Sequence, residues 1–200
     1  MVTVAWDVDD VLNNLMWAWF NEEWAPAHPG RSISYADIRE NPPHEVLGVP
    51  LSDYLSSIDA FRVSEKACQL RPCPEILDWI ERQGSGCLNV ALTARPMDSL
   101  PQMSHWLFRH FGSHFRVLGV VPVRLRPGEP MYHGSKGEFL SWFGRVDVLV
   151  DDSEENIRSA KESGVQGILF PQPWNSSRET VEGTLRLLTE MVTNPSRNSG

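Results

Sequence analysis

The sequence predicts an α/β protein with a Rossmann-like three-layer core, in which a parallel sheet of about five strands lies between helices. One observation predicts this class, and a second predicts an insertion in it. Short apolar runs rich in β-branched residues alternate with segments of helical periodicity along most of the chain. Between the first and second of these runs, the chain has short helical pieces separated by Pro and Gly. We therefore expect a small helical cap inserted after the first strand.

The first expected strand covers residues 2–6 and leads into three carboxylates, Asp7, Asp9 and Asp10. A strand buried on both faces has a nearly continuous apolar sequence, as this run does. Carboxylates crowded at its end repel one another, so a cation or a phosphate-handling role is expected to use them. Helix capping by a single Asp is the structural alternative.

The next segment, residues 12–24, has helical periodicity and four aromatic side chains between positions 17 and 24. Packing against other helices is one explanation of this stripe. The other is that Trp17 and Phe20 bind substrate by stacking on a planar ligand. Further short helices are expected over residues 52–58 and 63–70.

The remaining elements follow in alternation. Proline at the first turn, Gly after the last turn and serine N-caps mark the helix ends. We expect strands over residues 87–92, 117–121, 146–150 and 167–170, and helices over 75–83, 100–111, 138–143, 153–163 and 178–192. The predicted organisation is a core of residues 1–13 and 75–193, a helical cap of residues 14–74, and a polar, disordered tail of residues 194–200.

Parallel strands with helical crossovers bind ligands beyond their carboxyl ends. Asp7 and Thr93 follow the first two strands, and Asp151 and Asp152 follow the fourth. Lys136 opens a helix after a loop on the same edge. The topology therefore predicts that these side chains meet at one rim, although they lie far apart in sequence.

These residue types suit phosphoryl transfer. Asp7 can attack phosphorus, and Asp9 can act as general acid for the leaving group and then as base for water. A fixed positive charge from Lys136 and the hydroxyl of Thr93, with the backbone of Ala94 and Arg95, can bind the phosphoryl oxygens.

Carboxylates are also hard ligands that suit Mg²⁺. Asp7 and Asp152 would bind it directly, the Asp9 backbone carbonyl would be a third ligand, and Asp151 would support them from beside the site. Each residue alone has an ordinary structural explanation, such as a turn threonine, a surface lysine or a helix-entry Asp. Their joint placement favours the functional interpretation.

The sequence resembles the haloacid dehalogenase-like (HAD) phosphohydrolases. Asp7-Val8-Asp9-Asp10-Val11, Thr93, Lys136 and Asp151-Asp152 look like the four motifs of that family, in order and over nearly the whole chain. The resemblance implies a Rossmann-like core, a nucleophilic Asp7, an acid/base Asp9 and required Mg²⁺.

Within the family, residues 92–96, Asn156 and the late Pro173-Trp174-Asn175 are similar to the 5′(3′)-deoxyribonucleotidase (type C) branch. Asp10 departs from the pattern, because many relatives carry Gly at this position.

Composition and charge indicate which kinds of partner and which cellular location to expect. The formal charge of −8 argues against general binding to nucleic acid backbones. The longest apolar runs are too short to span a membrane. Three cysteines without metal-finger spacing, and a start without a basic leader region, indicate reduced thiols and a cytoplasmic location.

We therefore expect a Mg²⁺-dependent phosphomonoesterase acting on a small phosphorylated metabolite, with a nucleoside monophosphate as one candidate. One alternative is a non-catalytic protein that binds a phosphorylated ligand on the same fold. Another is a phosphatase acting on a nucleic-acid or protein phosphate, which the net charge disfavours.

Overall fold

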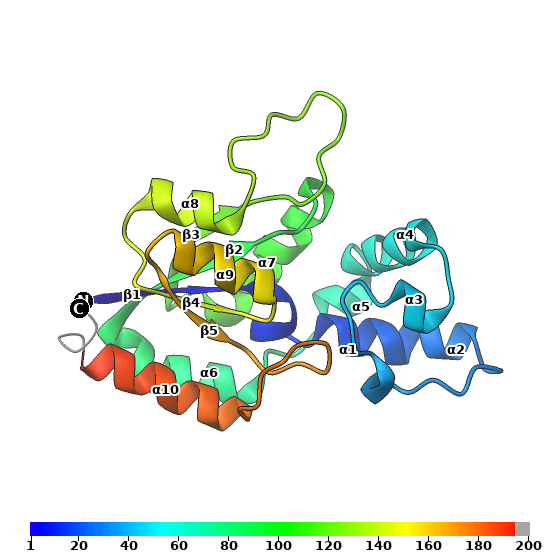
Figure 1. Ribbon diagram of the computed structural model, residues 1–200, viewed down its shortest axis with the longest axis horizontal. Helices are drawn as coiled ribbons and strands as arrows, with labels where there is room; N and C mark the ends of the chain where they lie inside the picture. Colours follow the sequence, from blue (N-terminus) through cyan, green and yellow to red (C-terminus); the bar gives the residue numbers. More distant parts are fainter. Residues whose placement is uncertain (195–200) are drawn as a thin grey trace.

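The computed structural model describes residues 1–194. Figure 1 shows two parts along the long axis, one built around a β-sheet and one made of helices. No helix of the described chain is long and apolar enough to cross a membrane. The prediction of a disordered tail over 194–200 falls, from residue 195 onward, outside the described residues.

The sheet has five parallel strands in the order β3-β2-β1-β4-β5. All five side chains of the first strand are buried, as expected for a central strand covered on both faces. This confirms the predicted α/β, Rossmann-like class. The strands are β1 (Val2–Trp6), β2 (Cys87–Thr93), β3 (Phe115–Val120), β4 (Val148–Asp151) and β5 (Gln166–Leu169).

Helices cover both faces of this sheet (Figure 1). Alternate residues of β1 separate the two cores: Val4 and Trp6 pack with α6, α7 and α10, whereas Ala5 packs with α8 and α9. The helices are α6 (Pro74–Gln83), α7 (Leu100–Phe111), α8 (Lys136–Phe143), α9 (Glu154–Glu162) and α10 (Val181–Thr193).

A helical insertion lies between β1 and α6 and has its own core, which includes Trp19, Ile38, Leu47 and Ile58. Two chain segments, one at each end of the insertion, join it to the sheet-bearing part. The two segments lie side by side, and the Cys73 amide of one donates to the Leu12 carbonyl of the other (2.8 Å). Its helices are α1 (Leu15–Trp19), α2 (Ala25–Ala27), α3 (His44–Leu47), α4 (Leu51–Arg62) and α5 (Glu65–Cys68).

The structure moves several predicted boundaries. Helix α8 begins at Lys136 rather than residue 138, because the Ser135 hydroxyl accepts from the Glu138 amide and caps the helix there. Helix α10 begins at Val181 rather than residue 178, because Thr180 is its cap. The helix predicted over 12–24 begins only at Leu15, because the backbone at Asn13 is extended (φ −134°, ψ 178°). The three cysteines, Cys68, Cys73 and Cys87, are free.

Candidate active site

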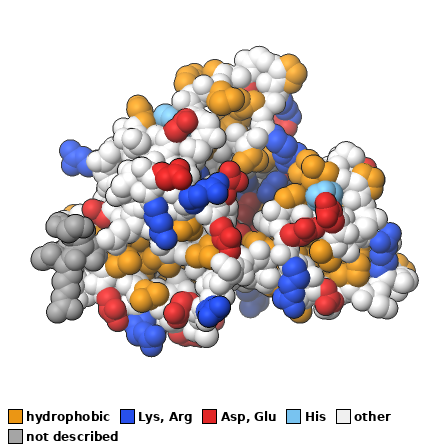
Figure 2. All heavy atoms as spheres, in the orientation of Figure 1, with side chains coloured by type: hydrophobic (Ala, Val, Ile, Leu, Met, Phe, Trp, Pro, Cys, Tyr) orange, Lys and Arg blue, Asp and Glu red, His pale blue; other side chains and the backbone are white. Residues whose placement is uncertain are grey.

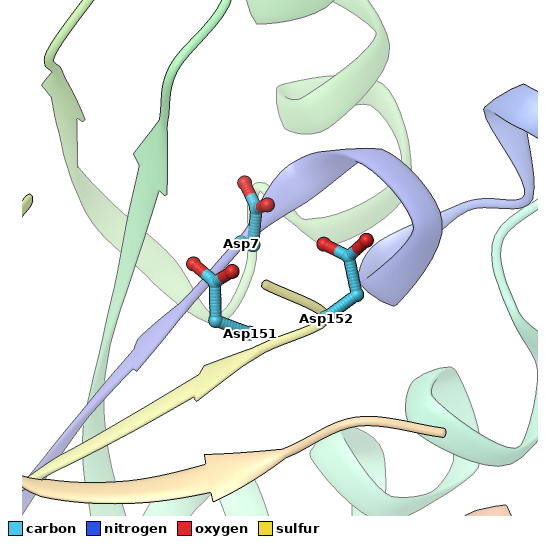
Figure 3. Close-up of side chains that lie close together, drawn as sticks. All are labelled: Asp7, Asp151 and Asp152. Atoms are coloured by element: carbon cyan, nitrogen blue, oxygen red, sulfur yellow. The ribbon is translucent and has the colours of Figure 1, made fainter. Parts of the chain in front are cut away.

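The carboxyl ends of β1 and β4 bring three buried carboxylates together. Asp7 follows β1, Asp151 ends β4 and Asp152 follows it, and oxygen atoms of all three lie within 4.8 Å of one another. Figure 3 shows the three side chains standing side by side at the strand ends. The Asp7 amide donates to the Val150 carbonyl (2.9 Å), so main-chain pairing between the two strands sets their spacing.

Lys136 joins this cluster from the first turn of α8. Its Nζ lies 2.9 Å from Asp7 Oδ1 and 2.7 Å from Asp151 Oδ2, and the residue is only 2% exposed. Burial alone would favour the neutral amine, but the carboxylates of Asp151 and Asp7 outweigh it and raise the pKa of Lys136. The lysine is therefore a fixed cation.

Asp151 is held by hydrogen bonds on both oxygens. Oδ1 accepts from the Ser153 amide (2.9 Å) and from Asn156 Nδ2 (3.0 Å), while Oδ2 accepts from Lys136. With its oxygens engaged in this way, Asp151 orients Lys136 and supports the cluster from beside it. Asn156 thus helps to fix Asp151 at the site.

Asp152 is positioned by a loop that follows β5. Trp174 Nε1 donates to Asp152 Oδ2 (2.8 Å), and Asn175 Nδ2 donates to the carbonyls of Asp152 and Phe170 (2.8 Å each). Burial, followed by repulsion from Asp151 and Asp7, raises the pKa of Asp152 well above its usual value.

The donor set fits a divalent cation. Burial, together with repulsion from Asp151 and Asp9, raises the pKa of Asp7 to about 7 despite the nearby Lys136. Within residues 1–194, no group donates a hydrogen bond to Asp7 Oδ2 or to Asp152 Oδ1. Two buried, mutually repelling carboxylates with unoccupied oxygens are the kind of ligands that Mg²⁺ takes. Asp7 and Asp152 could therefore hold this ion.

Asp9 lies outside this cluster and is bound by arginines. Arg95 Nε donates to Asp9 Oδ2 (2.8 Å) and Arg95 Nη2 to Oδ1 (2.6 Å), and Arg62 Nε lies 3.7 Å from Oδ2. Burial tends to raise the pKa of Asp9, but the two guanidinium groups more than offset it and lower the pKa. The Asp9 side chain is thus ionised and fixed, and it is not one of the three carboxylates that could share a metal.

Asp10 has a local structural role. Its φ of +60° lies in the left-handed region that Gly enters readily, and its Oδ1 accepts from the Met16 amide (2.9 Å). Gln172 Nε2 donates to the Asp10 carbonyl (2.6 Å). These contacts fix the turn that leads from β1 into the helical insertion.

A cavity of about 380 Å³ opens beside the carboxylates. The turn after β2 contributes Thr93, Ala94 and Arg95 to its wall, and the Thr93 hydroxyl accepts from the Arg95 amide (3.2 Å). The helical insertion closes the other side, mainly through α4. In Figure 2, acidic and basic side chains gather in the hollow between the two parts of the molecule.

Two predicted substrate-binding residues are not at this cavity. Trp17 is 50% exposed on the helical insertion, and Phe20 is buried in the core of the insertion, stacked on Trp24 with ring centroids 5.2 Å apart. Neither lines the cavity. Phe20 contributes to the packing of the insertion, whereas Trp17 lies on its surface, so neither is placed to stack on a ligand in this cavity. Tyr54 and Arg62 line the cavity instead, and no sequence motif distinguishes them.

No model of a protein family matches the sequence, and no curated protein matches it. Solved structures do match in shape. A haloacid dehalogenase-like family hydrolase from Streptococcus pneumoniae has a TM-score of 0.63 at 12% identity, over 96% of this chain and 98% of its own. A conserved haloacid dehalogenase-like protein of unknown function from Agrobacterium tumefaciens has a TM-score of 0.62 at 14% identity, over 97% and 99% of the two chains.

A HAD-superfamily hydrolase of subfamily IA from Geobacter sulfurreducens has a TM-score of 0.53 at 16% identity, over 94% of this chain and 95% of its own. At these identities the likeness establishes a shared fold. The matches do not support the narrower resemblance to the 5′(3′)-deoxyribonucleotidases.

Proposed function

We propose that this chain, which has the fold of the haloacid dehalogenase-like hydrolases, is a Mg²⁺-dependent phosphomonoesterase that acts on a small phosphorylated metabolite. The observation that carries the proposal is the position of Asp7. Its carboxylate lies between Lys136 and Asp152 and lines the cavity, with one oxygen free of hydrogen bonds from residues 1–194.

In the first step, Asp7 forms an O–P bond to the phosphoryl group while the ester P–O bond breaks and the leaving oxygen takes a proton. In the second step, water attacks the aspartyl-phosphate, releases phosphate and regenerates the Asp7 carboxylate. Lys136 offers charge and Thr93 a hydroxyl to the phosphoryl oxygens in both steps.

In this proposal, carboxylates of the same cluster would bind the metal ion. Asp7 and Asp152 would hold Mg²⁺, with the Asp9 backbone carbonyl as the third protein ligand and Asp151 beside them. When bound there, Mg²⁺ would offset the negative charges of the phosphoryl group and of the carboxylates. Lys136 and Asp151 then fix the orientation of Asp7.

Asp9 is the proposed general acid and base. Its carboxylate is ion-paired with Arg95, which favours the ionised form and opposes protonation. The acid role therefore requires this ion pair to open. We propose that entry of the leaving group into the cavity displaces Arg95 and frees Asp9 for proton transfer.

The helical insertion, residues 14–74, is the proposed cap over a core of residues 1–13 and 75–193. Its helix α4 supplies Tyr54, Leu55, Ile58 and Arg62 to the cavity wall, so it would contact the leaving group. An enclosed site excludes bulk water, which strengthens the electrostatic interactions of the phosphoryl group with the protein.

A nucleoside monophosphate is the narrower candidate substrate. Among the cavity-lining residues of the described chain, Tyr54 is the single aromatic side chain, so the wall offers little surface for base stacking. We therefore place non-nucleotide metabolites ahead of nucleotides. A binding protein without turnover is the alternative, and the free Asp7 oxygen beside a fixed cation argues for catalysis.

Replacing Asp7 with Asn tests the mechanism. The variant loses the nucleophile but keeps the volume of the side chain, so phosphate release should fall by at least about 1,000-fold with the fold intact. Asp53→Asn, on the exposed face of α4, is the matched control and should keep full activity. Rapid acid quenching of the wild type should also trap a phosphorylated protein that the Asp7→Asn protein does not form. Undiminished turnover by Asp7→Asn would rule out the aspartyl-phosphate route.

A further inference from the structure

The end of the cavity formed by α4 is basic. Three guanidinium groups line it: Arg62 from α4, Arg95 after β2, and Arg124 from the loop that follows β3. They come from three separate parts of the chain. In the proposed phosphoryl chemistry Arg95 holds Asp9 until the leaving group enters, and Arg62 and Arg124 have no assigned part.

Among residues 1–194, these three guanidinium groups have only two carboxylate partners, Asp9 and Asp59. Arg95 donates to Asp9 through Nε and Nη2, and Arg62 Nε lies 3.7 Å from Asp9 Oδ2. Asp59 Oδ1 accepts from both Arg62 Nη1 (2.9 Å) and Arg124 Nη2 (2.8 Å), so a single carboxylate serves two guanidinium groups. Three guanidinium groups therefore share two directly contacting carboxylates at this end of the cavity.

Arg62 also has a donor without a hydrogen bond. Its Nε is buried and faces Asp9 Oδ2 at 3.7 Å, too far for a hydrogen bond, and it has no other hydrogen-bond partner within the described residues. An N–H group left unpaired in a buried position costs free energy unless a ligand or water pairs with it. The side chains of Arg62 and Arg124 are 19% and 36% exposed, so both remain reachable from the cavity.

Asp59 keeps the two arginines in place without using up their donors. Each guanidinium has five N–H groups in a rigid fork, and the bond to Asp59 Oδ1 occupies one nitrogen of each. Two arginines that are held together in advance lose little freedom when they bind an anion. The rest of the wall near them is apolar and includes Leu51, Leu55 and Val123.

We propose that Arg62 and Arg124 form a second anion site, and that the substrate is a phosphomonoester whose leaving group carries its own phosphate or carboxylate. The inference rests on the proposed phosphomonoesterase function and names its substrate class. The transferred phosphoryl group binds at Asp7 and Lys136, the apolar side chains contact the middle of the leaving group, and the second anion binds at the arginines.

Matched pairs of substrates test this. A sugar bisphosphate is compared with the corresponding monophosphate, and phosphoglycolate with ethyl phosphate, so that one pair reports on a phosphate and the other on a carboxylate. The wild type should turn over the doubly anionic member of at least one pair with a kcat/KM about 10-fold higher or more. The pair with the larger preference identifies the anion.

Substitution of Arg124 assigns the preference to the site. Arg124→Gln should reduce the ratio of the two kcat/KM values by about 10-fold, mainly through KM for the doubly anionic substrate, and Arg124→Lys should keep more of the ratio than Gln does. Arg126→Gln is the control on the same loop. Arg126 pairs with Asp98, does not line the cavity, and should leave the ratio unchanged.

Binding measured by calorimetry on Asp7→Asn separates the proposed phosphomonoesterase function from the proposed second anion site. If no ester is hydrolysed by the wild type, the proposed function fails, and the anion site is judged from binding alone. Tighter binding of the doubly anionic compound, lost in Asp7→Asn/Arg124→Gln, supports the site. Equal binding of both members of every pair, or equal kcat/KM values in the wild type, would overturn it, and so would a preference that Arg124→Gln does not alter.

Discussion

At the scale of single residues, Lys136 is a buried cation that depends on its two carboxylate neighbours. Its ammonium group is buried between the carboxylates of Asp7 and Asp151, where an isolated charge of either sign would be costly. The three charges stabilise one another only as a set. The same three charges orient Asp7, the proposed nucleophile. Both the stability of the fold and the proposed chemistry therefore depend on Lys136.

Lys136→Met should therefore destabilise the protein by about 3–5 kcal/mol in urea unfolding, because it leaves two buried carboxylates without their cation. Phosphate release should be lost as well. Lys161→Met, on the exposed face of α9, is the control and should change neither quantity appreciably. A Lys136→Met protein with wild-type stability would show that the ammonium group is not needed to compensate the carboxylates.

At the scale of elements, the close approach of α8 and α9 positions Lys136. A Cβ atom added at Gly137 would lie 2.2 Å from Ser159 Oγ and 2.4 Å from the Ser159 carbonyl oxygen. Only Gly lets the first turn of α8 pack this tightly against α9. The Ser135 cap starts the helix one residue before the lysine.

Gly137→Ala should consequently cost about 1–3 kcal/mol of stability through overpacking. It should also lower activity by moving Lys136 away from Asp7. Gly134→Ala is the matched control three residues earlier, since its nearest neighbour would be 3.5 Å away, an ordinary contact. Equal unfolding midpoints for the two variants would contradict this account of the helix contact.

The elements also show what a sequence can predict. Apolar runs and cap residues placed the five strands and the main helices to within a few residues, because these signals are local. The convergence of Asp7, Lys136, Asp151 and Asp152 followed from the topology of parallel strands. Asn156, Trp174 and Asn175 belong to short sequence patterns, but the sequence does not predict their hydrogen bonds, because these depend on how the loops fold.

The helical insertion was harder to predict. Its hydrophobic residues pack around a core of their own, and the sequence does not say which face of α4 turns toward the sheet edge. The sequence therefore predicts Trp17 and Phe20 at a cavity that they do not line, and it does not identify Tyr54 and Arg62, which do line it. The pairing of Asp9 with Arg95 joins residues 86 positions apart and has no local signal.

At the scale of the whole molecule, buried acids concentrate where the two parts meet. In the metal-free protein, burial raises the pKa of Asp7 to about 7 and raises the pKa values of Asp10 and Asp152. The folded state therefore holds protons that these carboxyl groups release in the unfolded chain near their ordinary pKa of 3.8. The stability that these groups contribute is complete below that pH and is lost as the pH rises through about 7.

Thermal unfolding in EDTA should accordingly show a Tm that falls as the pH rises from about 4 to about 7. Added Mg²⁺ should restore the Tm most strongly at the upper end, where the carboxylates are ionised. The decline should be shallower in Asp7→Asn, which lacks one of the titrating groups. A Tm that rises over this range in EDTA, for wild type and variant alike, would contradict the assignment of these pKa shifts.

The most direct test of the central claim is phosphate release from a broad panel of phosphomonoesters, measured with Mg²⁺ and with EDTA. The panel contains sugar mono- and bisphosphates, phosphoglycolate, nucleoside 5′- and 3′-monophosphates and an aryl phosphate. We predict release that requires Mg²⁺, stops in EDTA and returns when Mg²⁺ is restored. Absence of release from every ester by folded protein with Mg²⁺ bound, or release that continues unchanged in EDTA, would contradict the account.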